Sequence, residues 1–100
     1  MAGEMITRLQ EIVQDRKANP QEGSYTNKLF DAGIERIAQK VGEEAIEVVI
    51  AALSEDNTVL LGELADLIYH MTVLLAARDE KWEHLEGVLE ARHVLAKERK

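Results

Sequence analysis

An all-α fold is predicted by three features of the 100-residue sequence. Apolar residues recur at steps of three and four, no run alternates in polarity for long enough to predict a strand, and there is one proline, Pro20. With 46% hydrophobic residues, residues 1–100 suit one compact domain, although a core of this size is small and self-association commonly supplements it. We therefore expect a single-domain bundle of helices that is completed by dimerisation.

The first two helices are short and are separated by a turn. The first is expected over about residues 4–17 and carries one apolar stripe: Met5, Leu9, Ile12 and Val13. Pro20 stops it, because proline cannot continue a helix interior. In the turn-rich segment that follows, Ser24 or Thr26 is placed to cap a short helix that Gly33 interrupts.

Three longer amphipathic patterns follow. From Ile34 to about Ser54, one face is expected to pack inward: Ile34, Ile37, Ala38, Val41, Ala45, Val48, Val49 and Ala52. Asp56, Asn57 or Thr58 can cap the next helix, whose apolar seam is Leu61, Leu64, Ile68, Met71 and Leu75. Residues 64–77 are apolar almost all round, so we expect part of this helix to lie in a subunit interface. A last helix before the charged tail 97–100 is predicted from Trp82, Leu85, Val88, Leu89 and Leu95.

Charge and composition exclude several classes of function. With 19 acidic and 12 basic residues the net charge is -7, which disfavours binding to nucleic acids and acidic membranes. The absence of cysteine excludes disulfides, thiolate zinc sites and cysteine nucleophiles, and it suits a reducing cytoplasm. No signal peptide is recognised, and the apolar run 67–77 is shorter than the roughly 20 residues of a membrane span. A soluble cytoplasmic protein is expected.

Acidic residues lie on the flanks of the two long helices. On a helical wheel Lys40, Glu43, Glu44 and Glu47 share one flank, with Glu44 nearest the apolar seam, and Glu63, Asp66 and His70 share a flank of the next helix. Most acid pairs at this spacing are simply solvated. Consecutive helices joined by a short turn usually pack antiparallel, however, so these two flanks can face each other.

Facing carboxylates need a positive partner, because two of them within about 4–5 Å repel by several kcal/mol. Lys28, Arg36 and Lys40 can supply part of that charge, but an all-carboxylate cage is typical of Mg²⁺ or Mn²⁺. A di-iron site requires Glu-x-x-His pairs, and His70 instead follows Asp66 by four residues. We interpret the remaining candidates as structural or solvated: His70, Tyr69 and Trp82 as packing residues, and His84 and His93 as solvated.

Three segments carry a resemblance to a known family: GSYTNKL at 23–29, IAQKVGEEAIEVVIAA at 37–52 and ELADLIYHMTVLL at 63–75. They resemble the phosphoribosyl-ATP pyrophosphohydrolases of histidine biosynthesis, a branch of the all-α nucleoside-triphosphate pyrophosphatase superfamily. The superfamily motif, EExxE followed a helix later by ExxD, matches Glu43, Glu44, Glu47, Glu63 and Asp66. The superfamily motif is shared with other branches. The resemblance is specific to the phosphoribosyl-ATP branch because of three further features: the GSYT segment, KVGEE and the YH pair after the second motif.

The resemblance implies a four- to five-helix bundle that hydrolyses phosphoribosyl-ATP between its α- and β-phosphates, giving phosphoribosyl-AMP and pyrophosphate in the second step of histidine biosynthesis. It implies Mg²⁺, with Mn²⁺ as a possible substitute, on Glu44, Glu47, Glu63 and Asp66. Glu43 and Glu47 would be the catalytic acids, Glu43 as a neighbouring acid or a water-orienting base. Phosphate or nucleotide contacts are implied for Ser24, Tyr25, Thr26, Lys28 and Lys40.

The resemblance also implies a homodimer and a stand-alone hydrolase, since the forms fused to a cyclohydrolase are longer and contain zinc-binding cysteines. Two alternatives remain open. A house-cleaning (d)NTP pyrophosphatase would have the same carboxylate cage, and turnover of dCTP and dUTP against phosphoribosyl-ATP distinguishes it. A non-enzymatic acidic helical dimer would have no bound metal, and a metal titration distinguishes that.

Overall fold

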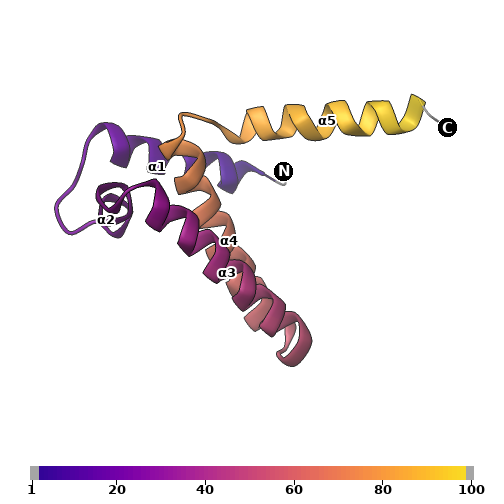
Figure 1. Ribbon diagram of the computed structural model, residues 1–100, viewed down its shortest axis with the longest axis horizontal. Helices are drawn as coiled ribbons and strands as arrows, with labels where there is room; N and C mark the ends of the chain where they lie inside the picture. Colours follow the sequence, from indigo (N-terminus) through magenta and orange to yellow (C-terminus); the bar gives the residue numbers. More distant parts are fainter. Residues whose placement is uncertain (1–2, 99–100) are drawn as a thin grey trace.

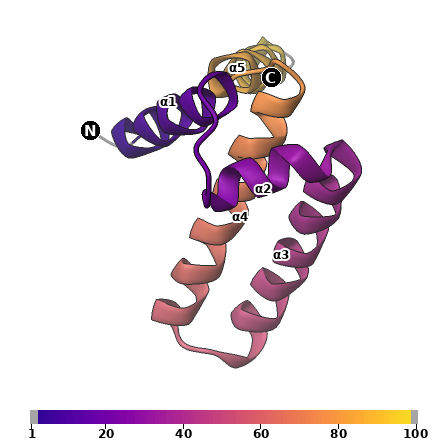
Figure 2. The ribbon, with the colours of Figure 1, turned by 90° about the vertical axis from the view of Figure 1, so that its left-hand side faces the viewer.

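The computed structural model describes the backbone of residues 3–98 and the side chains of residues 3–93. It contains five helices: α1 (Glu4–Ala18), α2 (Tyr25–Ala32), α3 (Ile34–Ser54), α4 (Asn57–Ala77) and α5 (Trp82–Glu98). Residues 3–98 contain no strand, so the predicted all-α fold is confirmed. α3 and α4 form a long antiparallel hairpin, with α1 and α2 gathered at one end of it (Figures 1 and 2).

The helices begin and end at residues that the sequence marks. α1 ends at Ala18, and Pro20 follows one residue after its C-cap Asn19. Of the two candidate caps for α2, Ser24 is the one used, because its Oγ accepts a hydrogen bond from the Asn27 N–H at 3.3 Å. Gly33 ends α2 with a positive φ of 95°, a conformation that glycine adopts without a steric penalty.

The two long helices are joined by a tight turn. Asp56 caps α4, since its carboxylate accepts a hydrogen bond from the Val59 N–H at 3.1 Å. At the other end of α4, Lys17 of α1 donates to the Ala76 carbonyl at 2.7 Å and to the Asp79 carboxylate at 2.7 Å. The Ala76 carbonyl, at the end of α4, also accepts the Asp79 N–H at 3.1 Å, so Lys17 adds a second donor there.

The core is small and lies where α1, α2, α3 and α4 meet. Its buried members are Val13, Leu29, Ile37, Val73 and Ala76. Partly buried apolar side chains pack against them, namely Leu9, Phe30, Tyr69, Leu74 and Ala77. All ten lie near one end of the hairpin, so the other end has cover only from its own two helices (Figure 2).

The prediction that the whole apolar face of residues 34–54 packs inward is therefore wrong in part. Ile37 is 1% exposed, but Val49 is 55% exposed, and Ile34, Ala38 and Ala52 are also exposed. On α4 the predicted seam residue Leu61 is 65% exposed. The reason is geometric: α1 and α2 cover only one end of the hairpin, and a helical stripe is buried only where another element lies over it.

α4 is long and apolar enough to cross a membrane, judged by length and composition alone. The expectation that no segment reaches this length is thereby corrected. The core helix of a soluble protein passes the same test, and the C-terminal half of α4 supplies the buried residues His70, Thr72, Val73 and Ala76.

α5 is attached to the rest of the molecule through its first turn. The buried Gln10 of α1 accepts a hydrogen bond from the Trp82 N–H at 2.6 Å and donates to the Glu83 carboxylate at 2.7 Å. The Trp82 indole donates to the Thr72 hydroxyl at 3.0 Å. Beyond this turn α5 extends away from the other helices, leaving Val88 and Leu89 exposed (Figure 1). The Leu95 side chain lies outside the described residues.

Candidate metal and nucleotide site

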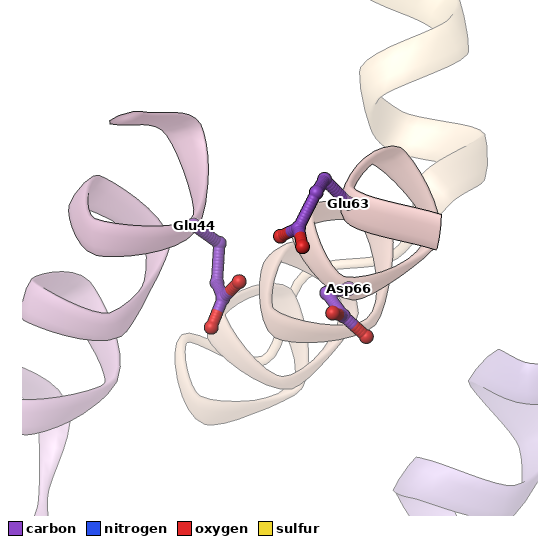
Figure 3. A group of neighbouring side chains, drawn as sticks. All are labelled: Glu44, Glu63 and Asp66. Atoms are coloured by element: carbon purple, nitrogen blue, oxygen red, sulfur yellow. The ribbon is translucent and has the colours of Figure 1, made fainter. Parts of the chain in front are cut away.

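Three carboxylates from the two long helices converge. One oxygen from each of Glu44 on α3 and Glu63 and Asp66 on α4 lies within 4.8 Å of the others (Figure 3). Two oxygens that bind the same Mg²⁺ at about 2.1 Å lie roughly 3–4 Å apart, so small side-chain rotations would bring this group to ligand distances. The donor set is all oxygen and all carboxylate, which fits a hard divalent cation.

Glu63 shows the electrostatic consequence of this convergence. Burial raises the pKa of its carboxyl group, and the negative charges of Asp66, Glu47 and Glu44 raise it further. Glu47 is outside the group of three carboxylates, yet its charge acts on Glu63 from the same flank of α3 as Glu44. The four acids therefore form one electrostatic site that favours a positive charge at its centre.

Lys40 is the cation beside these carboxylates. Its Nζ lies 3.4 Å from Glu44 Oε1 and 3.3 Å from Glu43 Oε1, one helical turn before each. Partial burial lowers the pKa of Lys40, but the Glu43 bond, the neighbouring Tyr25 phenol and the Glu44 bond raise it above its ordinary value overall. Lys40 is therefore positively charged at neutral pH and offsets only part of the acidic charge.

Glu43 is engaged by other side chains. The Gln39 amide donates to it at 3.0 Å, Lys40 lies at 3.3 Å, and Arg36 lies at 3.5 Å. The hydrogen bond from Lys40 is the largest effect that lowers the pKa of Glu43, and a lowered pKa makes a carboxylate a weaker base. The structure thus places Glu43 as a partner of Lys40 and leaves it outside the three converging carboxylates.

The predicted nucleotide-binding segment lies at the first turn of α2, where its side chains differ in accessibility. Thr26 is 9% exposed and its hydroxyl bonds the Tyr69 hydroxyl, while Ser24 serves as the helix cap. Tyr25 is 49% exposed, and Lys28 is exposed one turn after Ser24. Of the four residues in this segment that the resemblance implied as ligand contacts, Tyr25 and Lys28 therefore offer the most surface to a ligand.

Asn27 and Gln10 were not identified from the sequence. Asn27 is 8% exposed; its amide donates to the Arg16 carbonyl at 2.7 Å, and its carbonyl oxygen accepts from the Gln21 N–H at 2.8 Å. Asn27 thereby ties the end of α1 to the start of α2. An Asn or Gln in an amphipathic helix is ordinarily exposed, so only its unusual position on a buried face could have indicated this role.

The three histidines lie in the environments that the sequence predicted, His70 packed and His84 and His93 exposed. His70 is 6% exposed and packs among Tyr25 and Tyr69, with ring centroids 6.0 and 5.0 Å away. His84 is exposed and bonds Glu80 at 2.6 Å, and His93 is exposed. Tyr69 packs against the core, as expected of a packing residue, and burial raises the pKa of its phenol.

A cavity of about 540 Å³ lies elsewhere, between α1 and the turn from α4 to α5. It is lined by Gln14, Lys17, Ala18, Ala76, Asp79, Glu80 and Lys81. None of the clustered carboxylates lines it, and its Lys17–Asp79 pair is already neutralised internally. The candidate site is therefore identified by its converging carboxylates rather than by the size of a cavity.

The chain is similar to known proteins over most of its length. The family described as phosphoribosyl-ATP pyrophosphohydrolase matches residues 6–93. A phosphoribosyl-ATP pyrophosphatase of Streptococcus thermophilus is 50% identical over 88 residues, 88% of this chain and 85% of that protein. One of Clostridium acetobutylicum is 46% identical over 90 residues, 90% of this chain and 82% of that protein.

A longer relative aligns over the same region of this chain. The histidine biosynthesis bifunctional protein HisIE of Xanthomonas axonopodis pv. citri is 47% identical over 91 residues, which are 91% of this chain and 44% of that protein. The family match covers both long helices that carry the converging carboxylates. The chain therefore belongs to the phosphoribosyl-ATP pyrophosphohydrolase family.

Proposed function

We propose that the protein hydrolyses phosphoribosyl-ATP between its α- and β-phosphates. A water oxygen adds to phosphorus, the bridging P–O bond breaks, and pyrophosphate and phosphoribosyl-AMP result. Family membership and the names of the relatives support the choice of substrate. The observation that carries the chemistry is the convergence of Glu44, Glu63 and Asp66 from two helices within 4.8 Å.

Glu44, Glu63 and Asp66 would hold Mg²⁺, or Mn²⁺ in its place, with Glu47 as a fourth ligand from the same flank of α3. Support comes from the all-carboxylate donor set and from the raised pKa of Glu63, which reflects burial and uncompensated like charge. When bound, the cation supplies positive charge to the phosphate chain and lowers the pKa of a coordinated water.

The chain's own side chains would bind and orient the substrate. Lys40, charged and only 18% exposed, meets a phosphate oxygen, and Glu43 holds the lysine in place. Tyr25 and Lys28 contact the nucleotide and phosphate groups from the first turn of α2, with Ser24 and Thr26 shaping that turn. Glu43 and Glu47 are the candidate bases for the water, and the hydrogen bond from Lys40 lowers the pKa of Glu43 and weakens it in that role.

A homodimer is part of this proposal. Four exposed apolar residues of α3 lie at helical spacing and form what we call the α3 stripe: Ile46, Val49, Ile50 and Leu53. Burying them against a second copy would remove this apolar surface from water. We assign a cytoplasmic protein without a membrane or nucleic-acid partner for two reasons. Two of the clustered carboxylates, Glu63 and Asp66, lie on α4, the one apolar helix of membrane-spanning length in the described chain. The net charge is -7.

The test is a turnover assay with phosphoribosyl-ATP in the presence of Mg²⁺ or of a chelator, measuring pyrophosphate and phosphoribosyl-AMP. We expect turnover only with Mg²⁺ and much slower turnover of dCTP and dUTP. Glu47→Gln and Asp66→Asn should each lower kcat about a hundredfold or more while leaving the helical content unchanged. Glu86→Gln, which removes an exposed carboxylate from α5, is the matched control and should retain activity.

Three results would count against the proposal. Faster hydrolysis of a dNTP would assign the protein to the house-cleaning pyrophosphatases. Wild-type turnover by both carboxylate variants would mean that the cluster is not the site. No turnover of any nucleotide, together with no Mg²⁺ binding, would leave an acidic helical dimer as the better description.

A further inference from the structure

The side chain of His70 joins α2 to the helix that carries two of the clustered carboxylates. Its Nδ1 lies 2.7 Å from the Asp66 backbone carbonyl, and its Nε2 lies 3.2 Å from the Tyr25 hydroxyl. A carbonyl oxygen can only accept, so Nδ1 carries the proton and, in the neutral ring, Nε2 accepts. In this neutral form the Tyr25 hydroxyl is the donor, and a chain of hydrogen bonds runs from Tyr25 through His70 to Asp66.

The preceding residue of α4, Tyr69, makes a parallel contact. Tyr69 bonds the Thr26 hydroxyl and stacks on the Tyr25 ring, with centroids 6.2 Å apart and an interplanar angle of 26°. Two consecutive residues of α4 thus hold two consecutive residues of α2. We call this double contact the α2–α4 clasp. Since each half makes its own hydrogen bond, removing the His70 half leaves α2 attached through Thr26 and Tyr69.

The clasp connects the two parts of the proposed site. Tyr25 is 49% exposed at the first turn of α2, the segment proposed to contact the substrate. At the other end, the carbonyl that His70 bonds belongs to Asp66, whose carboxylate is in the cluster. His70 itself is 6% exposed, so it reaches a ligand only through Tyr25.

We propose that His70 is a positioning residue that fixes Tyr25 and the first turn of α2 in register with the carboxylate cluster. The inference rests on the proposed function, because it takes Tyr25 as a substrate contact. It follows that the Tyr25 oxygen, whose proton is committed to the ring, faces the ligand as a hydrogen-bond acceptor. Substrate affinity depends on this register. The carboxylates lie on α3 and α4, and the clasp joins α2 to α4, so the clasp does not hold the carboxylates together.

Three variants test the two hydrogen bonds of His70, to the Asp66 carbonyl and to the Tyr25 hydroxyl, one at a time: His70→Asn, His70→Gln and Tyr25→Phe. Asn keeps a polar atom near the Nδ1 position and loses the link to Tyr25, whereas Gln keeps a polar atom near Nε2. We expect His70→Asn and Tyr25→Phe each to raise KM for phosphoribosyl-ATP about tenfold with little change in kcat, as the loss of one neutral hydrogen bond predicts. His70→Gln should retain a KM nearer to wild type.

The double variant tests whether the two residues act together. If Tyr25 acts through His70, combining His70→Asn with Tyr25→Phe should raise KM no further than either change alone. Mn²⁺ affinity in the absence of substrate should be the same in all variants. A double variant whose KM effects multiply, or single variants with an unchanged KM, would overturn the proposal.

A readout without substrate keeps this test separate from the proposed function. Asn27 and Lys28 donate their backbone N–H groups to Ser24, so hydrogen exchange at these amides reports opening of the first turn of α2. We expect exchange about tenfold faster in His70→Asn and Tyr25→Phe than in wild type. His84→Asn, at an exposed histidine on α5, is the matched control. Unchanged hydrogen exchange at the Asn27 and Lys28 amides in both His70→Asn and Tyr25→Phe would contradict the positioning role of His70, even if the enzyme turned over as proposed.

Discussion

At the scale of single residues, the site is a set of carboxylates that repel one another. Burial and three neighbouring acids raise the pKa of Glu63, so the folded protein binds its proton more tightly than the unfolded chain does. An ionised Glu63 therefore destabilises the metal-free fold. This destabilisation is fully present above the raised pKa and disappears as the pH falls below the ordinary value near 4.5.

Neutralising two of these carboxylates should stabilise the metal-free protein. We expect the double variant Glu47→Gln with Glu63→Gln to have a higher Tm than wild type at pH 7 in the presence of a chelator, because the substitutions remove like-charge repulsion. The gain should shrink steadily as the pH is lowered, because Glu63 of the wild type then becomes protonated as well. Thermal unfolding between pH 4 and pH 7 measures this.

The control separates local repulsion from the overall negative charge. Glu86→Gln removes an exposed charge from α5 and should change Tm little at any pH. Adding Mg²⁺ should reverse the order, raising the Tm of the wild type and not that of the double variant. A metal-free double variant that is no more stable than wild type would mean that the carboxylates are too far apart to repel.

At the scale of elements, the first turns of α2 and α5 are held by side chains from other helices. Tyr25 and Thr26 bond α4, and Asn27 bonds the end of α1. Gln10 of α1 bonds the Trp82 N–H, one of the donors that the start of α5 leaves without an intrahelical partner. The direction of α5 is therefore set by a few hydrogen bonds at its first turn, whereas α2 also packs Leu29 and Phe30 against the core.

Gln10→Ala should weaken the attachment of α5. The variant loses both hydrogen bonds of a 5% exposed side chain, and we expect the free energy of unfolding to fall by about 2 kcal/mol. The hydrogen bond from Gln10 is the main effect that lowers the pKa of Glu83, so that pKa should rise toward its ordinary value in the variant. Urea denaturation and an NMR titration of Glu83 measure the two effects.

The hydrogen bond between Gln10 and Glu83 makes the stability of the fold depend on pH in the opposite direction to the effect of Glu63. A lowered carboxyl pKa stabilises the fold above the ordinary value and stops doing so as the pH falls through the lowered one, so the Gln10–Glu83 contribution is lost in acid. Gln14→Ala, one turn further along α1, is the control and should leave the Glu83 titration unchanged. An unaltered titration in Gln10→Ala would show that this bond does not exist in solution.

At the scale of the whole molecule, a single chain has a larger radius of gyration than a compact domain of the same length. Its radius of gyration is 15.5 Å, whereas a compact domain of 100 residues has about 13 Å. The hairpin of α3 and α4 projects from the core at one side, and α5 projects at another (Figures 1 and 2). Leu53 at the far end of the hairpin is 84% exposed. A second copy packed on this surface would explain both the shape and the exposed apolar residues.

Charged substitutions in the α3 stripe should separate the subunits. We expect wild-type protein to sediment as a dimer and the variant Val49→Glu with Leu53→Glu as a monomer, because a buried interface does not tolerate unpaired charge. Met5→Glu, at a 63% exposed apolar residue of α1, is the matched control and should remain dimeric. Circular dichroism distinguishes a separated subunit from an unfolded one. A monomeric wild type would contradict the assignment of this surface.

The sequence by itself determined the helices and the flanks on which the acids lie. Pro20 and Gly33 act on their immediate neighbours, and α1 and α2 end close to them. Among the candidate caps that the sequence left open, Ser24 and Asp56 are the ones used. The helical repeat likewise placed Lys40 one turn before Glu44, and the short turn after α3 predicted the antiparallel pairing that brings Glu44 to Glu63 and Asp66.

Only the tertiary structure decided how those helices are covered and what their polar side chains bond. Val49 and Ile37 belong to one apolar face, yet one is exposed and the other buried, because α1 and α2 cover one end of the hairpin alone. Gln10 bonds Trp82 and Glu83, and His70 bonds Tyr25, at separations of 45 or more residues in the chain. Helical periodicity relates residues three or four apart, so it carries no information about contacts at that separation.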